Sequence, residues 1–188
     1  PFRIARLGIA RTFQNPSLFL KMSVIENVMV GRHVKSRRGF FSCAFRPPGQ
    51  RREERAIRDA AMEWLKFVGL EAKADVAAGS LAFGQRRMVE LARAMAIEPS
   101  LILLDEPASG LNNHETEDLA ALIRSIRDKG VTILLVEHDM SMVMDLSDEI
   151  VVLHFGRKIA EGTPAEIQND PQVVSVYLGQ DVDHASAG

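Results

Sequence analysis

The sequence predicts an α/β fold built on a parallel sheet, and three stretches indicate it. Two continuous apolar runs, LILL at 101–104 and VTILLV at 131–136, have the length of buried strands. Between them, a stretch from Asn112 or Asn113 to Lys129 places its apolar residues on one helical face. Strands that are apolar on both faces and joined by a helix are typical of a βαβ unit in a sheet covered by helices.

The flanking elements are expected to be mostly helical. Residues 35–50 predict a loop, because Phe, Pro and Gly residues interrupt a basic stretch there. Helices are predicted over 53–69 and 85–96, where apolar residues fall on one face and Gly or Pro follows. After the second strand we expect a short helix over 141–146, a hairpin that turns at Gly156, and a final helix from Pro164.

Charge is unevenly distributed, although the net charge is only -2. The stretch 32–58, called here the basic insertion, holds nine Lys or Arg residues against two acids. A solvated surface is the simpler interpretation, and contact with an anionic membrane surface or a partner is the alternative. No apolar run is long enough to span a bilayer. The single cysteine, Cys43, excludes an internal disulfide and fits a reducing compartment.

Polar side chains follow both predicted strands. Asp105 and Glu106 come after the first strand, and Glu137-His138-Asp139 comes after the second. Ligands of open α/β sheets bind beyond the carboxyl ends of the strands, so these residues are expected at one edge. One carboxylate can hold Mg²⁺, another can orient or deprotonate an attacking water, and a histidine can contact a phosphate. The alternative is that they cap the loops after the strands.

Three further stretches complete the pattern. They are ARTFQNPSLF at 10–19, which contains Gln14, SLAFGQRRMVELARAMA at 80–96, and SGLN at 109–112. Gly84 and Gln85 open the second of the predicted helices. The first turn of a helix offers backbone N–H groups and a positive dipole end to an anion, so an anion-binding helix start is expected there.

In this order the stretches resemble the motifs of ABC transporter ATP-binding subunits. Gln14 matches the Q-loop, LAFGQ at 81–85 the signature, LILLDE the Walker B motif, SGLN the D-loop, and His138 the switch histidine. Three stretches are similar to sequences of the branched-chain amino acid subfamily, and within it to the LivG-type subunit: GIARTFQNPSLF, LAFGQRR and GTPAEIQNDPQVVSVYLG. The resemblance implies a P-loop NTPase-type (RecA-like) parallel sheet core with a helical ABC subdomain.

The resemblance also implies a division of the chain into four parts. Residues 1–22 would be a core remnant with the Q-loop, and 23–98 the helical subdomain with the signature and the basic insertion. Residues 99–163 would be the α/β core with Walker B, the D-loop and the switch histidine. Residues 164–188 would be a C-terminal extension.

ATP and Mg²⁺ are the implied cofactors. By resemblance, Glu106 polarises the attacking water, Asp105 and Gln14 serve Mg²⁺, and His138 contacts the γ-phosphate. Gln14 would also contact the water. The residues that would contact nucleotide are Leu81, Ala82, Phe83, Gly84, Gln85, Ser109 and Asn112.

The sequence departs from the family pattern in two ways. The usual signature LSGGQ has Ala82 and Phe83 as replacements here, and Asn112 stands where the D-loop has an aspartate. More importantly, the phosphate-binding pattern G-x-x-x-x-G-K-[ST] is absent from the sequence. We therefore expect a chain that corresponds to a longer ATPase from the Q-loop onward, without Walker A and the N-terminal strands. Alone, it is expected to bind ATP poorly and to hydrolyse it negligibly.

The implied partners are a second ATPase subunit (LivF-like, or an identical copy), two transmembrane permease subunits and, indirectly, a periplasmic or extracellular amino-acid-binding protein. No nucleic acid is expected as a partner. The chain is expected to be a peripheral subunit at the cytoplasmic face of the inner membrane. The alternatives are a non-transport ABC ATPase and an inactive accessory remnant. A DNA-repair ATPase would carry a long coiled coil between the Q-loop and the signature. The 66 residues between Gln14 and Leu81 contain no heptad run.

Overall fold

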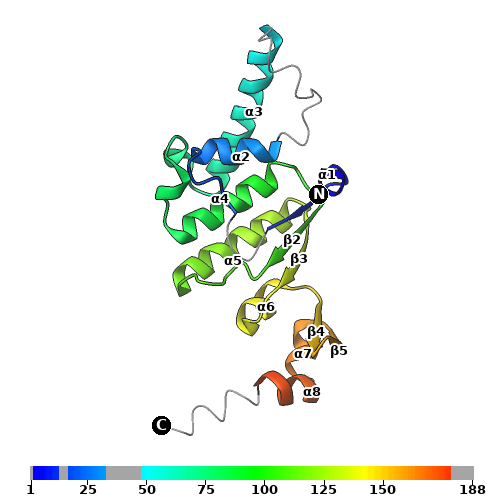
Figure 1. The fold of residues 1–188 in the computed structure, drawn as a ribbon. Coiled ribbons are helices and arrows are strands. Elements are labelled where there is room, and N and C mark those ends of the chain that lie inside the picture. The colour runs from blue at the N-terminus through cyan, green and yellow to red at the C-terminus, as the bar shows by residue number, and fades with distance from the viewer. Residues whose placement is uncertain (1, 13–16, 33–47, 179–188) are drawn as a thin grey trace. The chain divides into compact units, whose positions relative to one another are not determined.

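A computed structural model describes residues 2–12, 17–32 and 48–178 (Figure 1). The chain forms two compact units, Pro1–Glu137 and His138–Gly188, and each is described by itself. The boundary after Glu137 falls within the predicted part 99–163, and the four-part division implied by the family resemblance stays a prediction. Gln14 and residues 35–47 of the loop predicted over 35–50 lie outside the described residues.

A three-stranded parallel sheet forms the centre of the first unit. Its strands are β1 (Ile9–Arg11), β2 (Leu101–Asp105) and β3 (Thr132–Val136), and they lie side by side in that order (Figure 1). A short helix, α1 (Phe2–Arg6), precedes β1. Within the β2–β3 pair, Leu101 lies opposite Thr132 and Asp105 opposite Val136. The predicted parallel βαβ unit is thereby confirmed.

The two faces of the sheet differ in exposure. Ala10, Ile102 and Leu104 point to one face and are almost fully buried. On the other face, Leu134 is 56% exposed and Val136 is 54% exposed. The prediction of a sheet covered by helices therefore holds for one face only, as far as the described residues go. The uncovered face carries apolar side chains of the kind that proteins normally bury.

Helix α5 (Asn113–Asp128) connects β2 to β3 and begins with a capping box. The Asn112 side chain accepts a hydrogen bond from the Glu115 backbone, and the Glu115 carboxylate accepts one from the Asn112 backbone. The helix buries Leu119, Leu122 and Ile126 on one face, as predicted. Asn112, rather than Asn113, is the capping residue of the two that the sequence offered.

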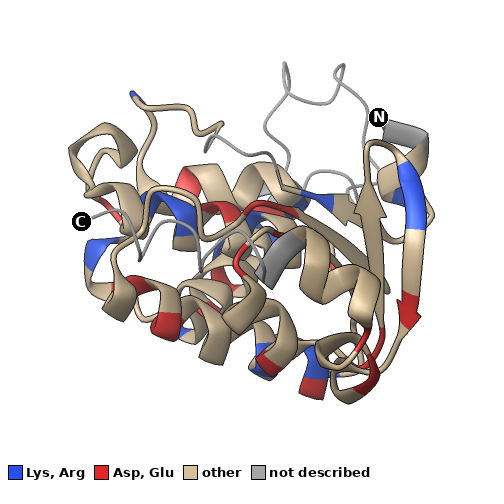
Figure 2. Cartoon of the chain, turned by 90° about the horizontal axis from the view of Figure 1, so that it is seen from below, with Lys and Arg blue, Asp and Glu red and all other residues tan. Residues whose placement is uncertain are grey.

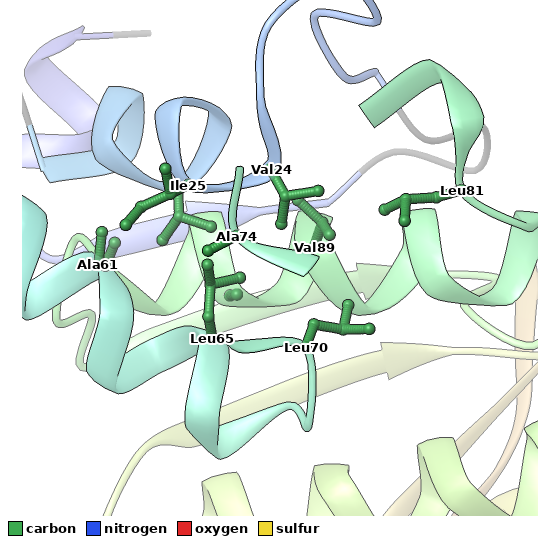
Figure 3. Close-up of a cluster of buried hydrophobic side chains, with 11 residues drawn as sticks. Val24, Ile25, Ala61, Leu65, Leu70, Ala74, Leu81 and Val89 are labelled. Carbon is green, nitrogen blue, oxygen red and sulfur yellow. The ribbon is translucent and has the colours of Figure 1, made fainter. Parts of the chain in front are cut away.

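Three more helices pack together in the first unit, namely α2 (Val24–Arg32), α3 (Pro48–Phe67) and α4 (Phe83–Met95). Short 3-10 turns at Glu71–Lys73 and Ala78–Ser80 connect α3 to α4. Figure 3 shows their apolar side chains gathered in one cluster, which includes Ile25, Leu65 and Val89. This cluster fixes the start of α4 relative to the other two helices.

Helix α3 differs from its prediction at both ends. It begins at Pro48, so residues 48–50 are helical and not part of a loop, and it ends at Phe67. A proline at the first helical position is favourable, because the N–H it lacks would have no partner inside the helix. Trp64, near the end of α3, is partly buried and packs against the cluster.

The second unit contains the predicted short helix and hairpin. These are α6 (Met140–Leu146), β4 (Ile150–His154) and β5 (Arg157–Gly162). They are followed by α7 (Pro164–Gln168), α8 (Pro171–Val173) and a π-helical turn, Val174–Leu178. Buried residues from the hairpin and the last helices form a small core: Ile150, Val152, Ile167 and Val173.

Charged residues of both signs are spread along the helices (Figure 2). This agrees with the small net charge of -2. None of the helices in the described ranges is long and apolar enough to cross a membrane.

Candidate functional site

Asp105 and Glu106 lie where β2 ends, as predicted. Asp105 is the last strand residue, and the backbone N–H of Glu106 donates a hydrogen bond to the Val136 carbonyl oxygen at 2.9 Å. Glu106 has a φ of 43°, which is unusual for a residue other than glycine. The bond to Val136 is therefore made with the Glu106 backbone in the left-handed region.

Asp105 has a partner that sequence reasoning missed. The guanidinium of Arg11, at the end of β1, donates a hydrogen bond to the Asp105 carboxylate at 3.1 Å. Both side chains are partly exposed to solvent, so the pair contributes little to stability. Its effect is to hold the carboxylate at the edge of the sheet where β1 and β2 end.

The 109–112 segment is tied to the ends of β2 and β3. The Glu137 carboxylate, after β3, accepts a hydrogen bond from the Ala108 backbone at 2.9 Å. The Ser109 backbone donates to the Glu106 carbonyl oxygen at 3.2 Å. Ser109 is therefore placed directly beside Glu106. Glu137 was not predicted to have this role, although its position after a strand was the available signal.

The other members of the second triplet belong to the second unit. His138 opens that unit and is exposed. Asp139 caps α6, since its carboxylate accepts hydrogen bonds from the Ser141 and Met142 backbones. The capping alternative considered for the strand-end residues is thus correct for Asp139.

The 81–85 segment forms the start of α4. The N-cap residue, Ala82, makes no side-chain capping hydrogen bond. The first turn of a helix has backbone N–H groups without intrahelical partners, and these suit an anion. Leu81 and Gly84 are buried, whereas Ala82 and Phe83 are exposed. A helix therefore starts in this segment, as predicted, and anion binding there stays a prediction.

Two basic residues that the sequence did not single out brace this helix start. The Arg86 guanidinium donates to the carbonyl oxygens of Leu81 and Gly79, at 2.9 Å each. The Lys73 ammonium donates to the Gln85 side-chain oxygen at 2.9 Å. These bonds fix the backbone before α4 and the Gln85 side chain. Nothing in the sequence distinguished them from other basic residues, because their partners are known only once the helix is placed.

The 81–85 and 109–112 segments lie against each other. A Cβ added at Gly110 would be 3.1 Å from the Phe83 ring, so the ring packs directly on that glycine. Gly110 has a φ of +80°, a conformation that favours glycine. A Cβ added at Gly84 would overlap the Glu115 carboxylate, with the Cδ atom only 2.8 Å away. The structure therefore brings two predicted site segments together.

Gly84→Ala is expected to displace the Glu115 carboxylate and to break the capping box of α5. Loss of a helix cap typically costs about 0.5–2 kcal/mol, and a similar fall in the free energy of unfolding is expected here. Urea denaturation measures it. In the double variant Gly84→Ala/Glu115→Ala the overlap is gone. Its loss of unfolding free energy should therefore be smaller than the sum of the losses in the two single variants. A loss equal to that sum would contradict the contact between Gly84 and Glu115.

The chemistry of the site fits Mg²⁺ with substrate phosphates. Mg²⁺ is usually held by one or two carboxylates while phosphates and water supply the other oxygens. Asp105 is one such carboxylate at the strand end. Within the described ranges, no three His, Cys, Asp or Glu residues come together as a metal site, so the protein does not offer a complete cage there. Gln14, the other predicted metal residue, lies outside the described residues.

Family models and known proteins match the sequence over most of its length. A family model described as "ABC transporter" matches residues 2–109, and one described as "Branched-chain amino acid ATP-binding cassette transporter" matches 157–183. The high-affinity branched-chain amino acid transport ATP-binding protein BraF of Pseudomonas aeruginosa is 46% identical, across 95% of this chain and 70% of BraF. The corresponding protein LivG of Escherichia coli is 45% identical over the same shares.

A solved structure shares the fold. It is an ATP-binding cassette of an ABC transporter in its ADP conformation, with a TM-score of 0.76 and 31% sequence identity. The match covers 95% of this chain and 71% of that one.

Proposed function

Because the chain belongs to the family of ABC transporter ATP-binding proteins, we propose that it is part of an ATPase that energises the uptake of branched-chain amino acids through a membrane permease. The observation that carries this is the contact of the signature, 81–85, with the D-loop, 109–112, beside Glu106. The choice of solute is supported by the two named relatives and by the subfamily match at 157–183.

Catalysis in this proposal is positioning and charge stabilisation, as in phosphoryl transfer generally. Asp105 supplies a carboxylate oxygen for Mg²⁺, and Gln14 supplies a second oxygen. When bound, the metal ion offsets the negative charge of the phosphate oxygens. Glu106 accepts a hydrogen bond from the attacking water and polarises it, and His138 donates a hydrogen bond to the γ-phosphate.

The start of α4 acts on a nucleotide held by a second ATPase subunit. Ala82 leaves the first-turn N–H groups without a side-chain cap, which suits the γ-phosphate of a nucleotide presented from outside. The proposed partner is a LivF-like subunit or a second copy of the chain. Two permease subunits, and through them an amino-acid-binding protein, complete the assembly. The chain is then a peripheral subunit at the cytoplasmic face of the membrane.

The phosphate loop is proposed to come from a segment that precedes these residues in a longer protein. The sequence contains no G-x-x-x-x-G-K-[ST], and the chain spans 70% of the length of BraF and of LivG. The exposed apolar side chains of Leu134 and Val136, on edge strand β3, supply a place where a further strand and helix would pack. Burial of that face would complete the sheet cover that the sequence predicts.

The experiment compares two proteins, the 188-residue chain and the longer protein that includes the preceding segment. The chain alone is expected to show no magnesium-dependent ATP hydrolysis above background. The longer protein, reconstituted with the second ATPase subunit, the permease and the binding protein, is expected to hydrolyse ATP and to import leucine. Hydrolysis by the chain alone would contradict the proposed need for a phosphate loop. Hydrolysis by the longer protein without any response to the permease would favour a non-transport ATPase.

A further inference from the structure

One face of α4 carries charged residues where apolar residues would be expected. Phe83, Arg87, Glu90 and Arg93 are spaced by four, three and three residues, which places them in one stripe along the helix. The stripe is about 15 Å long at the usual helical rise. The side chains of Arg87 and Glu90 are 0% and 2% exposed. We call these four residues the α4 stripe.

The side chains of the α4 stripe contact one another in sequence. The Arg87 guanidinium lies 5.8 Å from the centroid of the Phe83 ring, a cation–π distance. It also donates to one carboxylate oxygen of Glu90 at 3.3 Å. The other Glu90 oxygen lies 3.8 Å from the Arg93 guanidinium. Glu90 therefore joins two arginines through its two oxygens.

The two end residues of the α4 stripe contact residues outside the helix. At one end the Phe83 ring packs on Gly110 of the D-loop. At the other end the Arg93 guanidinium donates to the Ser17 carbonyl oxygen at 2.8 Å and to its hydroxyl at 3.2 Å. Ser17 lies three residues after Gln14 in the sequence and before α2. The stripe thus connects two motif regions that are far apart along the chain.

Packing alone does not explain this choice of residues. Removing charges from water is costly, and well-packed apolar residues in place of a buried ion pair are often as stable or more so. Here burial lowers the pKa of the Arg93 guanidinium, and the Glu90 carboxylate partly opposes that effect. What buried charges supply is a fixed geometry, because hydrogen bonds and ion pairs between charged groups hold the two side chains at a set distance and direction. A positional role accounts for their presence.

We propose that the α4 stripe is a set of positioning residues that holds the chain at Ser17 in a fixed relation to the signature and the D-loop. A displacement at Ser17 is then transmitted through Arg93, Glu90 and Arg87 to the Phe83 contact with Gly110. The inference rests on the proposed function, in which the Q-loop and the signature act on nucleotide. It adds Arg87, Glu90 and Arg93 as positioning residues that contact no nucleotide themselves.

The test uses the longer protein in complex with its permease and measures amide hydrogen exchange together with ATP hydrolysis. Glu90→Gln keeps the side-chain shape and removes the charge that joins the two arginines. It is expected to speed exchange over residues 17–20 and 82–85, and to lower kcat about 2- to 30-fold with little change in KM for ATP. Glu63→Gln is the matched control, since Glu63 forms an exposed pair with Lys66 at the same spacing. It should change neither quantity.

A second variant covers the case in which Glu90→Gln does not fold. Arg93→Gln removes the guanidinium that donates to both the carbonyl oxygen and the hydroxyl of Ser17, and it should speed exchange at 82–85. Unchanged exchange at 82–85 in both variants, or in the one that folds, would overturn the proposed stripe. Changed exchange in a protein that hydrolyses no ATP would keep the stripe and overturn the proposed function, so the two failures are distinguishable.

Discussion

Glu106→Gln in the longer, reconstituted protein is expected to lower ATP turnover by about 10²–10⁴-fold while ATP still binds. Glutamine has nearly the same shape but cannot accept a proton from the attacking water. The unusual φ of Glu106 and its backbone bond to Val136 do not depend on the carboxylate, so the backbone of the site should stay in place. Steady-state hydrolysis and binding of radiolabelled ATP measure the two effects separately.

The matched control for this prediction is Glu117→Gln. Glu117 lies on the exposed face of α5, and the same chemical change there should leave turnover unaltered. Asp105→Asn distinguishes a metal-binding carboxylate from one that polarises water. If Asp105 binds Mg²⁺, this variant should need a higher Mg²⁺ concentration for the same turnover. Turnover of Glu106→Gln at the level of the unaltered protein would show that another residue polarises the water.

The sheet and its edge could be predicted because the sequence carries them locally. LILL and VTILLV are apolar without interruption, as strands buried in a parallel sheet are, and the capping box at Asn112 has its partner three residues away. Asp105 and Glu106 follow directly from the strand end. These features depend on neighbours in the chain, so no long-range contact had to be known.

Other features depend on contacts between distant residues. Arg11 and Asp105 are 94 residues apart, and their pairing follows from the register of β1 against β2. Arg86 and Lys73 resemble any surface basic residue until the start of α4 is placed beside them. The helix start at Pro48 was missed because Pro-Pro-Gly is also typical of loops. In each case the tertiary structure decides between local alternatives.

Gly31→Ala is expected to destabilise the protein by about 1–3 kcal/mol, although alanine is the better helix former. Gly31 is buried in α2 where that helix meets α4. An added Cβ would overlap the Arg93 carbonyl oxygen and would lie 3.3 Å from the Ala96 Cβ. A backbone oxygen cannot swing aside as a side chain can, so the two helices must separate. The intrinsic gain of about 1 kcal/mol from alanine is too small to offset this.

Urea denaturation measures the balance, with a lower midpoint at an unchanged slope as the expected result. Ala56→Gly, at an exposed position of α3, is the control, because it reports the intrinsic glycine–alanine difference without any contact. Both variants should be less stable than the unaltered protein, even though they change the residue in opposite directions. Since Arg93 also ends the α4 stripe, Gly31→Ala should speed amide exchange at Ser17, which Ala56→Gly should not. A stabilised Gly31→Ala would mean that α2 and α4 separate at no cost and that helix propensity alone decides the outcome.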